Sequence, residues 1–183
     1  SRECQPGSIF LAIKGEKVDG HDFVGDAFAR GAVLSLTSRP VDERCVVVGD
    51  VTVAIGKLAT YLRRELKNLK VIGITGSQGK TTTKELLASI LREQGETVSP
   101  KGNNNNELGV PLTILQCTEQ TRFCVVEMGA RHVGDIASLA AIAGQDIGVV
   151  LKVAAAHIGE FGSIEKIAST KSEMISSLNE NGI

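Results

Sequence analysis

The stretch Gly73-Ile74-Thr75-Gly76-Ser77-Gln78-Gly79-Lys80-Thr81-Thr82-Thr83 decides how this chain is organised. It follows the apolar pair Val71-Ile72, so a strand leads into a glycine-containing turn and then into a helix. Gly76 and Gly79 allow the backbone to bend tightly and to point its N–H groups at an anion. In such a setting Lys80 supplies a charge for phosphate oxygens, and the Thr81 hydroxyl can bind Mg²⁺. The stretch therefore predicts a phosphate-binding loop (P-loop), although Ile74 stands where the full pattern has its first glycine.

The composition is that of an ordinary globular protein. Of the 183 residues, 42% are hydrophobic and 22% are charged, and the formal net charge is −1. This balance favours neither a nucleic-acid partner nor an anionic membrane surface, and we expect no membrane insertion because no apolar run is long enough. The cysteines at positions 4, 45, 117 and 124 have no metal-like spacing, so we expect reduced thiols in a cytoplasmic protein.

Residues 1–69 are expected to form a small α/β domain. Ile55, Leu58, Leu62 and Leu66 recur at helical spacing, which predicts an amphipathic helix over 51–67. Apolar runs predict strands over 9–13, 32–36 and 45–48, and a short helix over 23–29. The segment 68–70 is the expected connection to a second domain.

Residues 70–183 repeat a strand followed by a helix. Strands are predicted over 71–75, 122–128 and 146–153, and helices over 81–93, 134–143 and 164–178. Continuous apolar strands that alternate with helices are typical of a mostly parallel, doubly wound sheet covered on both faces. Ligands of such sheets bind beyond the carboxyl ends of the strands. The P-loop, Glu127 and His157 all follow strand ends, so we expect them to meet at one rim.

Each of these polar residues also has a plain structural interpretation. Glu127 at the end of an apolar strand can hold Mg²⁺ or orient a nucleophile, or it can be a solvated strand-end carboxylate. His157, which follows three alanines, can be a ligand or a structural histidine. Lys171 has the spacing of a solvent-facing helix lysine.

Two polar segments also have both a structural and a functional interpretation. The run Asn103-Asn104-Asn105-Asn106 can be a polar loop, because Asn favours turns, or it can offer amides to an anionic, peptide-like substrate. Asp19-Gly20-His21 is equally compatible with a turn and with a ligand contact.

Taken together, the motifs resemble the Mur ligase family over essentially the whole chain. The segment 75–82 resembles the family's own phosphate loop, which accounts for the missing first glycine. Two segments resemble the branch that adds D-alanyl-D-alanine, namely Asn105-Asn106-Glu107-Leu108-Gly109-Val110-Pro111-Leu112-Thr113 and Glu127-Met128-Gly129-Ala130. His157, Phe161-Gly162-Ser163 and Lys171 also fit, whereas Lys152 and Ala154 stand where the family often has Asn and Gly.

The resemblance implies a set of site residues. It implies that ATP phosphates bind Gly76, Ser77, Gln78, Gly79, Lys80, Thr81 and Thr82. It implies Mg²⁺ on Thr81 and Glu127, with a second Mg²⁺ on His157. Lys171 matches a lysine that is carbamylated in relatives. Lys80, Glu127, His157 and Lys171 are thus the implied catalytic residues. The UDP-muramoyl-peptide would contact Ser1, Arg2, Asp19, Gly20, His21, Asn104, Asn105 and Asn106.

The implied activity is an ATP-dependent amide ligation. D-Ala-D-Ala would be joined to a UDP-muramoyl-tripeptide through an acyl phosphate, by a monomeric enzyme. The resemblance further implies that 70–183 is an incomplete ATP-binding domain, that a C-terminal D-Ala-D-Ala domain is absent, and that the chain alone is inactive. Three alternatives remain: a Mur ligase that adds the third peptide residue, a P-loop kinase of small molecules, and a binding module. The sequence does not distinguish lysine from diaminopimelate in the substrate.

Overall fold

The computed structural model describes residues 4–154, 158–179 and 181–183. The chain forms two compact units, Ser1–Ile55 and Gly56–Ile183. The predicted domain boundary at 69/70 stays a prediction, since the two compact units divide earlier, inside a helix.

The first unit is built on a three-stranded parallel sheet in the order β1-β2-β3. Its strands are β1 (Ile9–Leu11), β2 (Leu34–Thr37) and β3 (Cys45–Val47). A 3₁₀ turn, η1 (Gly20–Phe23), leads into α1 (Val24–Ala29). Buried Val24, Ala27 and Phe28 of α1 form a small core with Ala12 and Ala32. The three predicted strands and the short helix are confirmed, with β1 and β3 shorter than expected.

The long helix α2 (Val51–Glu65) contains the division between the two units. Its last turns belong to the second unit, where Arg63 donates to the Asp146 carboxylate at 2.9 Å and to the Gly144 carbonyl at 3.2 Å. The same carboxylate accepts the Val71 N–H at 2.8 Å. Asp146 therefore ties the end of α2 to the first strand of the second sheet.

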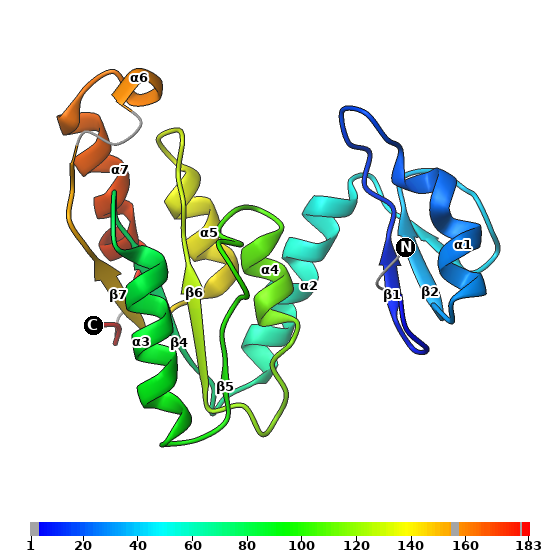
Figure 1. Ribbon diagram of the computed structural model, residues 1–183, viewed down its shortest axis with the longest axis horizontal. Helices are drawn as coiled ribbons and strands as arrows, with labels where there is room; N and C mark the ends of the chain where they lie inside the picture. Colours follow the sequence, from blue (N-terminus) through cyan, green and yellow to red (C-terminus); the bar gives the residue numbers. More distant parts are fainter. Residues whose placement is uncertain (1–3, 155–157, 180) are drawn as a thin grey trace. The chain divides into compact units, whose positions relative to one another are not determined.

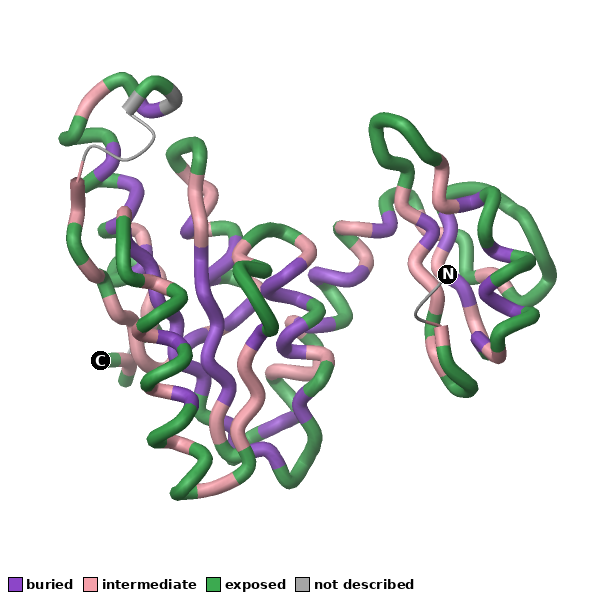
Figure 2. The backbone as a smooth tube through the Cα atoms, viewed as in Figure 1, coloured by how far each residue is buried: buried purple, intermediate pink, exposed green. Residues whose placement is uncertain are grey.

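The second unit contains a four-stranded sheet in the order β5-β6-β4-β7, in which every pair is parallel. The strands are β4 (Lys70–Thr75), β5 (Thr97–Val98), β6 (Phe123–Glu127) and β7 (Ile147–Val150). Figure 2 shows the central strands β4 and β6 as nearly continuous buried segments. This confirms the predicted parallel sheet.

Helices cover both faces of this sheet (Figure 1). On one face α3 (Lys80–Arg92) packs Ala88 and Leu91 against Ile72, Ile74 and Val125. The other face is covered by α4 (Gly109–Ile114), α5 (Asp135–Ala143), α7 (Ile164–Ser176) and the end of α2. A short helix, α6 (Ile158–Phe161), precedes α7.

Gly73 in β4 lies where two methionine side chains pack closely on the sheet. A Cβ at this position would lie 3.0 Å from the Met174 sulfur and 3.2 Å from the Met128 methyl group. Glycine therefore lets α7 pack directly on the central strand.

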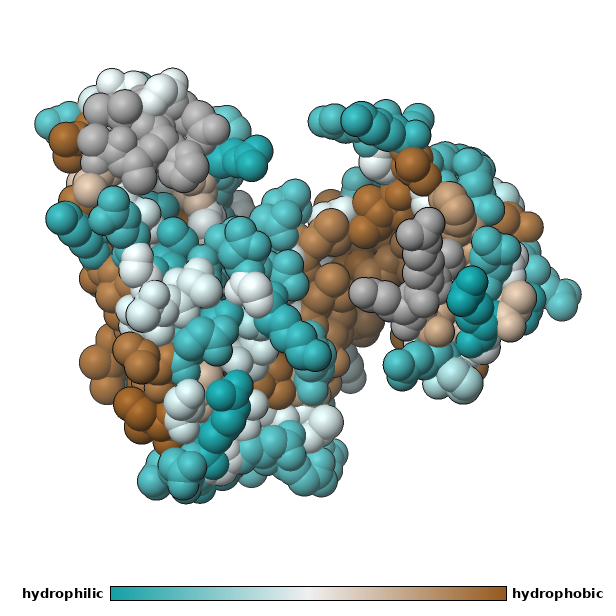
Figure 3. All heavy atoms as spheres, viewed as in Figure 1, coloured by the Kyte–Doolittle hydropathy of each residue, from teal (hydrophilic) through white to brown (hydrophobic). Residues whose placement is uncertain are grey.

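Not all apolar side chains are buried. Leu86 and Ile90 on the outer side of α3 are 62% and 65% exposed, and Figure 3 shows hydrophobic side chains gathered over the lower part of this helix. In the described part of the chain, no helix has the length and apolar character needed to cross a bilayer.

Candidate active site

The P-loop has the predicted strand–turn–helix geometry. β4 ends at Thr75 and α3 begins at Lys80, with Gly79 as the residue before the first helical turn. Gly76 and Gly79 adopt φ values of +154° and +85°, which favour glycine. Among the described residues, no side chain caps α3 at Gly79. The first-turn N–H groups and the positive end of the helix dipole are thus available to an anion.

Lys80 folds back over the loop that precedes it. Its Nζ donates to the Gly76 carbonyl at 2.8 Å, and Lys80 lines a cleft in the second unit. Gly76 also packs against the segment after β7, since a Cβ there would lie 2.8 Å from the Leu151 Cβ. Glycine at 76 therefore serves both the turn and this close approach.

Ser77 binds within the protein. Its N–H donates to the Lys152 carbonyl at 2.9 Å, and its hydroxyl donates to the Ala154 carbonyl at 2.9 Å while accepting the Ala154 N–H at 3.0 Å. Lys152 and Ala154 are the two positions that depart from the family pattern. Ser77 thus fixes the backbone of the segment that contains these two positions. The predicted contact of Ser77 with the nucleotide stays a prediction.

Thr81, Glu127 and Asn105 meet at the carboxyl ends of the strands. The Thr81 hydroxyl donates to Glu127 Oε2 at 3.0 Å, and the Asn105 side-chain amide donates to Glu127 Oε1 at 3.0 Å. Glu127 comes from the end of β6, Thr81 from the first turn of α3, and Asn105 from the loop before α4. The structure therefore brings together three residues that the sequence predicted separately.

Glu127 has the surroundings of a cation ligand. The residue is 1% exposed, and among the described residues its two carboxylate oxygens accept hydrogen bonds from neutral groups only. Within the described residues Glu127 takes part in none of the ion pairs. A buried carboxylate without a counter-charge is costly, and oxygen donors such as Glu127 and Thr81 suit Mg²⁺. The described residues contain no cluster of three His, Cys, Asp or Glu side chains that could hold a metal alone. This fits Mg²⁺, which binds one or two protein oxygens together with substrate phosphates.

The asparagine loop, residues 103–106, is held in a fixed shape. The Asn105 carbonyl accepts the Gly129 N–H at 2.8 Å, and the Asn106 side chain accepts the Gly109 N–H at 2.9 Å. A Cβ on Gly129 would lie 2.9 Å from the Asn105 side-chain oxygen, and a Cβ on Gly109 would clash with the Asn104 backbone. Both glycines thus permit close approach of the loop.

The P-loop and the asparagine loop line one cleft of about 750 Å³ in the second unit. The P-loop contributes Gly76, Ser77 and Lys80 to the lining, and the asparagine loop contributes Asn103 to Asn106, followed by Glu107. The remaining lining comes from the segment after β6 and from α5, α6 and α7, namely Gly129, Ala130, Arg131, His132, Asp135, Ser138, Leu139, Phe161, Ile167 and Lys171.

Lys171 reaches this cleft from α7. The residue is only 5% exposed, which contradicts the interpretation of a solvent-facing lysine. Burial and the nearby positive charge of Lys80 lower the pKa of the Lys171 amine, whereas Asp135 and Glu173 act in the opposite direction. At a given pH, a larger fraction of Lys171 is therefore in the neutral amine form than for an ordinary lysine.

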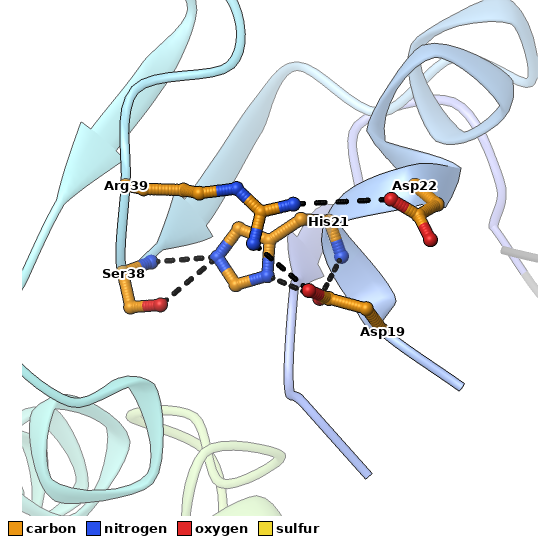
Figure 4. A network of polar contacts seen from close by, with 5 residues as sticks. All are labelled: Asp19, His21, Asp22, Ser38 and Arg39. Atoms are coloured by element: carbon orange, nitrogen blue, oxygen red, sulfur yellow. Dashed lines mark hydrogen bonds and ion pairs between the residues drawn. The ribbon is translucent and has the colours of Figure 1, made fainter. Parts of the chain in front are cut away.

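In the first unit, Asp19 and His21 form an internal network (Figure 4). His21 Nε2 accepts the Ser38 N–H at 2.9 Å, so its other nitrogen, Nδ1, carries the proton that is donated to Asp19 at 2.6 Å. Arg39 donates to Asp19 at 2.8 Å and holds the pKa of that carboxyl well below its usual range, with help from the His21 N–H and ring. His21 is 4% exposed and both ring nitrogens have protein partners. The network is thus a structural element of the first unit, and its predicted substrate contacts, including Gly20, stay predictions.

Three predicted site residues, Ser1, Arg2 and His157, lie outside the described residues. The cleft lining does not include five further predicted site residues, Gln78, Gly79, Thr81, Thr82 and Glu127. Sequence reasoning missed Arg131, His132 and Asp135, which follow directly on the Glu127-Met128-Gly129 segment. Their position just after the carboxyl end of a central strand was the available signal.

Comparison with known proteins agrees with this geometry. Residues 74–183 match the Mur ligase middle domain, and residues 1–75 match the Mur ligase family catalytic domain. A UDP-N-acetylmuramoyl-tripeptide–D-alanyl-D-alanine ligase of Mycobacterium bovis is 44% identical over 205 aligned positions, which cover all of this chain and 40% of the relative. The ligase of the same name from Escherichia coli K12 is 42% identical, with 100% of this chain and 41% of the relative covered.

Solved structures show the same relationship. MurF from Acinetobacter baumannii superposes with a TM-score of 0.91 at 40% identity, covering 99% of this chain and 40% of that one. MurF ligase from Thermotoga maritima, solved in complex with ADP, gives a TM-score of 0.86 at 39% identity and covers 99% of this chain and 43% of that one. The chain thus spans about two fifths of the length of these relatives, and it belongs to the Mur ligase family.

Proposed function

We propose that this chain is the nucleotide-binding part of an ATP-dependent ligase that joins D-Ala-D-Ala to UDP-N-acetylmuramoyl-tripeptide, in the synthesis of peptidoglycan precursors. The observation that carries the proposal is the meeting of Thr81, Glu127 and Asn105 beside the P-loop. The names of the relatives support these substrates. The bound ADP of the Thermotoga maritima neighbour supports the nucleotide.

The P-loop would bind the ATP phosphates. The first-turn N–H groups of α3 and the Lys80 ammonium would contact phosphate oxygens, with Gly76 and Gly79 providing the turn. Thr81 and Glu127 would hold Mg²⁺, and His157 would take part in a second site. When bound, Mg²⁺ would supply positive charge beside the transferring phosphoryl group.

A carboxylate resists attack by an amine, so the reaction needs activation. The terminal carboxylate of the tripeptide would attack the γ-phosphorus of ATP, and the bond to the bridging oxygen would break to release ADP. The amine of D-Ala-D-Ala would then attack the acyl phosphate, lose its proton, and expel phosphate from a tetrahedral intermediate. Lys80 would stabilise the negative charge that accumulates on the transferred group.

Lys171 would be carbamylated on its side-chain amine and would act in this modified form. A lysine reacts with CO₂ only as the neutral amine, and the lowered pKa of Lys171 increases that form. The product has a carboxylate in place of an ammonium, which would reverse the charge presented to the cleft near Lys80. A site that binds Mg²⁺ and polyphosphate would thereby gain negatively charged oxygen atoms that can interact with cations.

The asparagine loop would bind the muramoyl-peptide. Asn104 and Asn106 are exposed and line the same cleft as Lys80, while Asn105 donates a hydrogen bond to Glu127. In the first unit, the residues that would contact the muramoyl-peptide are Ser1, Arg2, Asp19, Gly20 and His21. ATP and a UDP-linked precursor as substrates imply a cytoplasmic reaction, and we expect a monomeric enzyme.

A phosphate-release assay on the complete ligase tests the proposal. We expect continued release of phosphate and ADP only when ATP, UDP-muramoyl-tripeptide and D-Ala-D-Ala are all present, because without D-Ala-D-Ala the reaction stops at the acyl phosphate. Turnover with UDP-muramoyl-dipeptide and a third amino acid would instead indicate the other Mur ligase activity. A stable phosphoester without phosphate release would indicate a kinase.

A further inference from the structure

Lys84 is a fully buried lysine that the proposed chemistry does not use. It lies one helical turn after Lys80 on α3, and its side chain is 0% exposed. Its Nζ donates to the Pro100 carbonyl at 2.7 Å and to the Gly102 carbonyl at 2.9 Å, and it pairs with the Glu85 carboxylate at 2.8 Å. An ammonium has three N–H donors, and these three oxygens match them. Lys84 therefore binds the protein itself and has no donor left for a ligand.

Burial of the Lys84 ammonium destabilises the fold unless every hydrogen-bond partner is in place. Burying an ammonium is unfavourable without compensating acceptors, and the Pro100 carbonyl would be left buried and unpaired without Lys84. Both carbonyls belong to the segment that leads directly into Asn103. Lys84 thus anchors the start of the asparagine loop to the helix that follows the P-loop.

The end of the asparagine loop is anchored to the same helix by a second route. Asn105 donates to Glu127, and Glu127 accepts from Thr81 in the first turn of α3. The loop is therefore attached to α3 twice, through Glu127 at residue 81 and directly at residue 84. Because one rigid helix carries both attachments, the position of the loop relative to the P-loop is fixed.

We propose that Lys84 is a positioning residue that sets the asparagine loop at the correct distance from the P-loop, so that the carboxylate substrate meets the γ-phosphate. This inference rests on the proposed function in one respect, the assignment of the asparagine loop to the muramoyl-peptide. Lys84 itself contacts no substrate and acts through Asn105.

The test replaces Lys84 with Met, which keeps the length and apolar stem of the side chain and removes its donors. In the complete ligase we expect Lys84→Met to raise KM for UDP-muramoyl-tripeptide about tenfold or more, from the loss of buried hydrogen bonds. We expect KM for ATP to change less than about twofold, since the P-loop keeps its own contacts. Arg92→Met is the matched control, because Arg92 is a basic residue of the same helix that reaches Ser99 through an exposed bond only.

Two further readouts separate positioning from a general loss of stability. Hydrogen exchange of the peptides that span 99–108 and the Gly129 N–H is expected to rise in Lys84→Met, while α5 stays protected. In a double-mutant cycle, Asn105→Ala and Lys84→Met are expected to be non-additive in their effect on KM, as for residues of one network. If Lys84→Met does not fold, Lys84→Gln, which keeps one amide donor, takes its place with a smaller expected effect.

The outcomes distinguish the two proposals. Unchanged exchange of the asparagine loop would overturn the positioning role of Lys84. Equal increases of both KM values or strict additivity with Asn105→Ala would also overturn it. Increased hydrogen exchange of the asparagine loop with an unaltered KM for the muramoyl-peptide would instead contradict the binding of this substrate by the loop. That part of the proposed function would then be wrong.

Discussion

The Thr81 hydroxyl lies 3.0 Å from Glu127 Oε2, so the first turn of α3 is joined to the carboxyl end of the neighbouring strand β6. Thr81 and Glu127 are 46 positions apart in the sequence. Their contact places a hydroxyl and a buried carboxylate next to a loop shaped for phosphate. This relationship underlies the proposed ATP and Mg²⁺ site.

Replacing Thr81 with Val removes the hydroxyl and keeps the shape of the side chain. We expect kcat/KM for ATP to fall at least about tenfold, with a steeper dependence on Mg²⁺ concentration, because one proposed metal ligand is lost. Initial rates measured over a Mg²⁺ series provide the check. The control is Thr83→Val, the same substitution two positions further along α3. Equal Mg²⁺ dependence in both variants would speak against Thr81 as a ligand.

Lys80→Ala is expected to abolish turnover in the complete ligase while the fold stays intact. A charge that stabilises the transferred phosphoryl group contributes about 100-fold or more to the rate. Circular dichroism would verify the fold, and the phosphate-release assay would report the rate. Near-normal ligation by this variant would refute the role assigned to Lys80.

Gly129→Ala places a Cβ 2.9 Å from the Asn105 side-chain oxygen. We expect this overpacking to displace Asn105 from Glu127 and to cost about 1–3 kcal/mol in the free energy of unfolding. Urea denaturation measures that cost. Gly25→Ala is the control, since a Cβ at this helical glycine meets nothing within 4 Å. A Gly129→Ala protein as stable as the Gly25→Ala protein would show that the loop adapts freely.

Lys171 is expected to form a carbamate at a lower pH than an ordinary lysine, because its pKa is lowered. Carbon-13 NMR in labelled bicarbonate would detect one carbamate signal that rises with pH and disappears in Lys171→Met but not in Lys166→Met. Lys80→Ala removes a nearby positive charge, so the pKa of Lys171 rises and the carbamate signal shifts to higher pH. A bare amine at Lys171 across this pH range would contradict the proposed carbamate.

Asp19 gives the first unit a pH-dependent stability. Its pKa is lower in the folded chain than in the unfolded chain, chiefly because of Arg39, so its charged form favours folding above the unfolded value of about 4. This contribution is lost as the pH falls toward the folded value. We therefore expect Asp19→Asn to lower the unfolding temperature at pH 7, and the difference from the parent protein to shrink below about pH 4. Scanning calorimetry tests this, with Asp26→Asn on α1 as control; a difference that is independent of pH would contradict it.

The sequence predicted most of the fold because its strongest signals are local. The P-loop and the apolar strands over 71–75 and 122–128 need only a short window to be recognised. β5 was missed because it has two residues, and α4 because its six residues include Pro111. The strand predicted to reach Val153 ends at Val150, since the backbone beyond it turns to bind Thr75 and Ser77.

The site was predictable only in part. Lys80, Thr81 and Glu127 follow from motif and strand end. The burial of Lys84 and Lys171 does not, because a helical lysine at either position reads as solvent-facing until its tertiary neighbours are known. The partners of His21 also depend on a distant residue, Ser38. These are long-range contacts that no local pattern encodes.

The central claim is that this site transfers the γ-phosphoryl group of ATP to a carboxylate. The most direct test uses UDP-muramoyl-tripeptide labelled with oxygen-18 in its terminal carboxylate, together with ATP, D-Ala-D-Ala and the complete ligase, followed by mass spectrometry of the phosphate released. We expect one labelled oxygen in each phosphate, because the bridging oxygen of the acyl phosphate comes from the labelled carboxylate and leaves with the phosphate. Phosphate free of the label would contradict it.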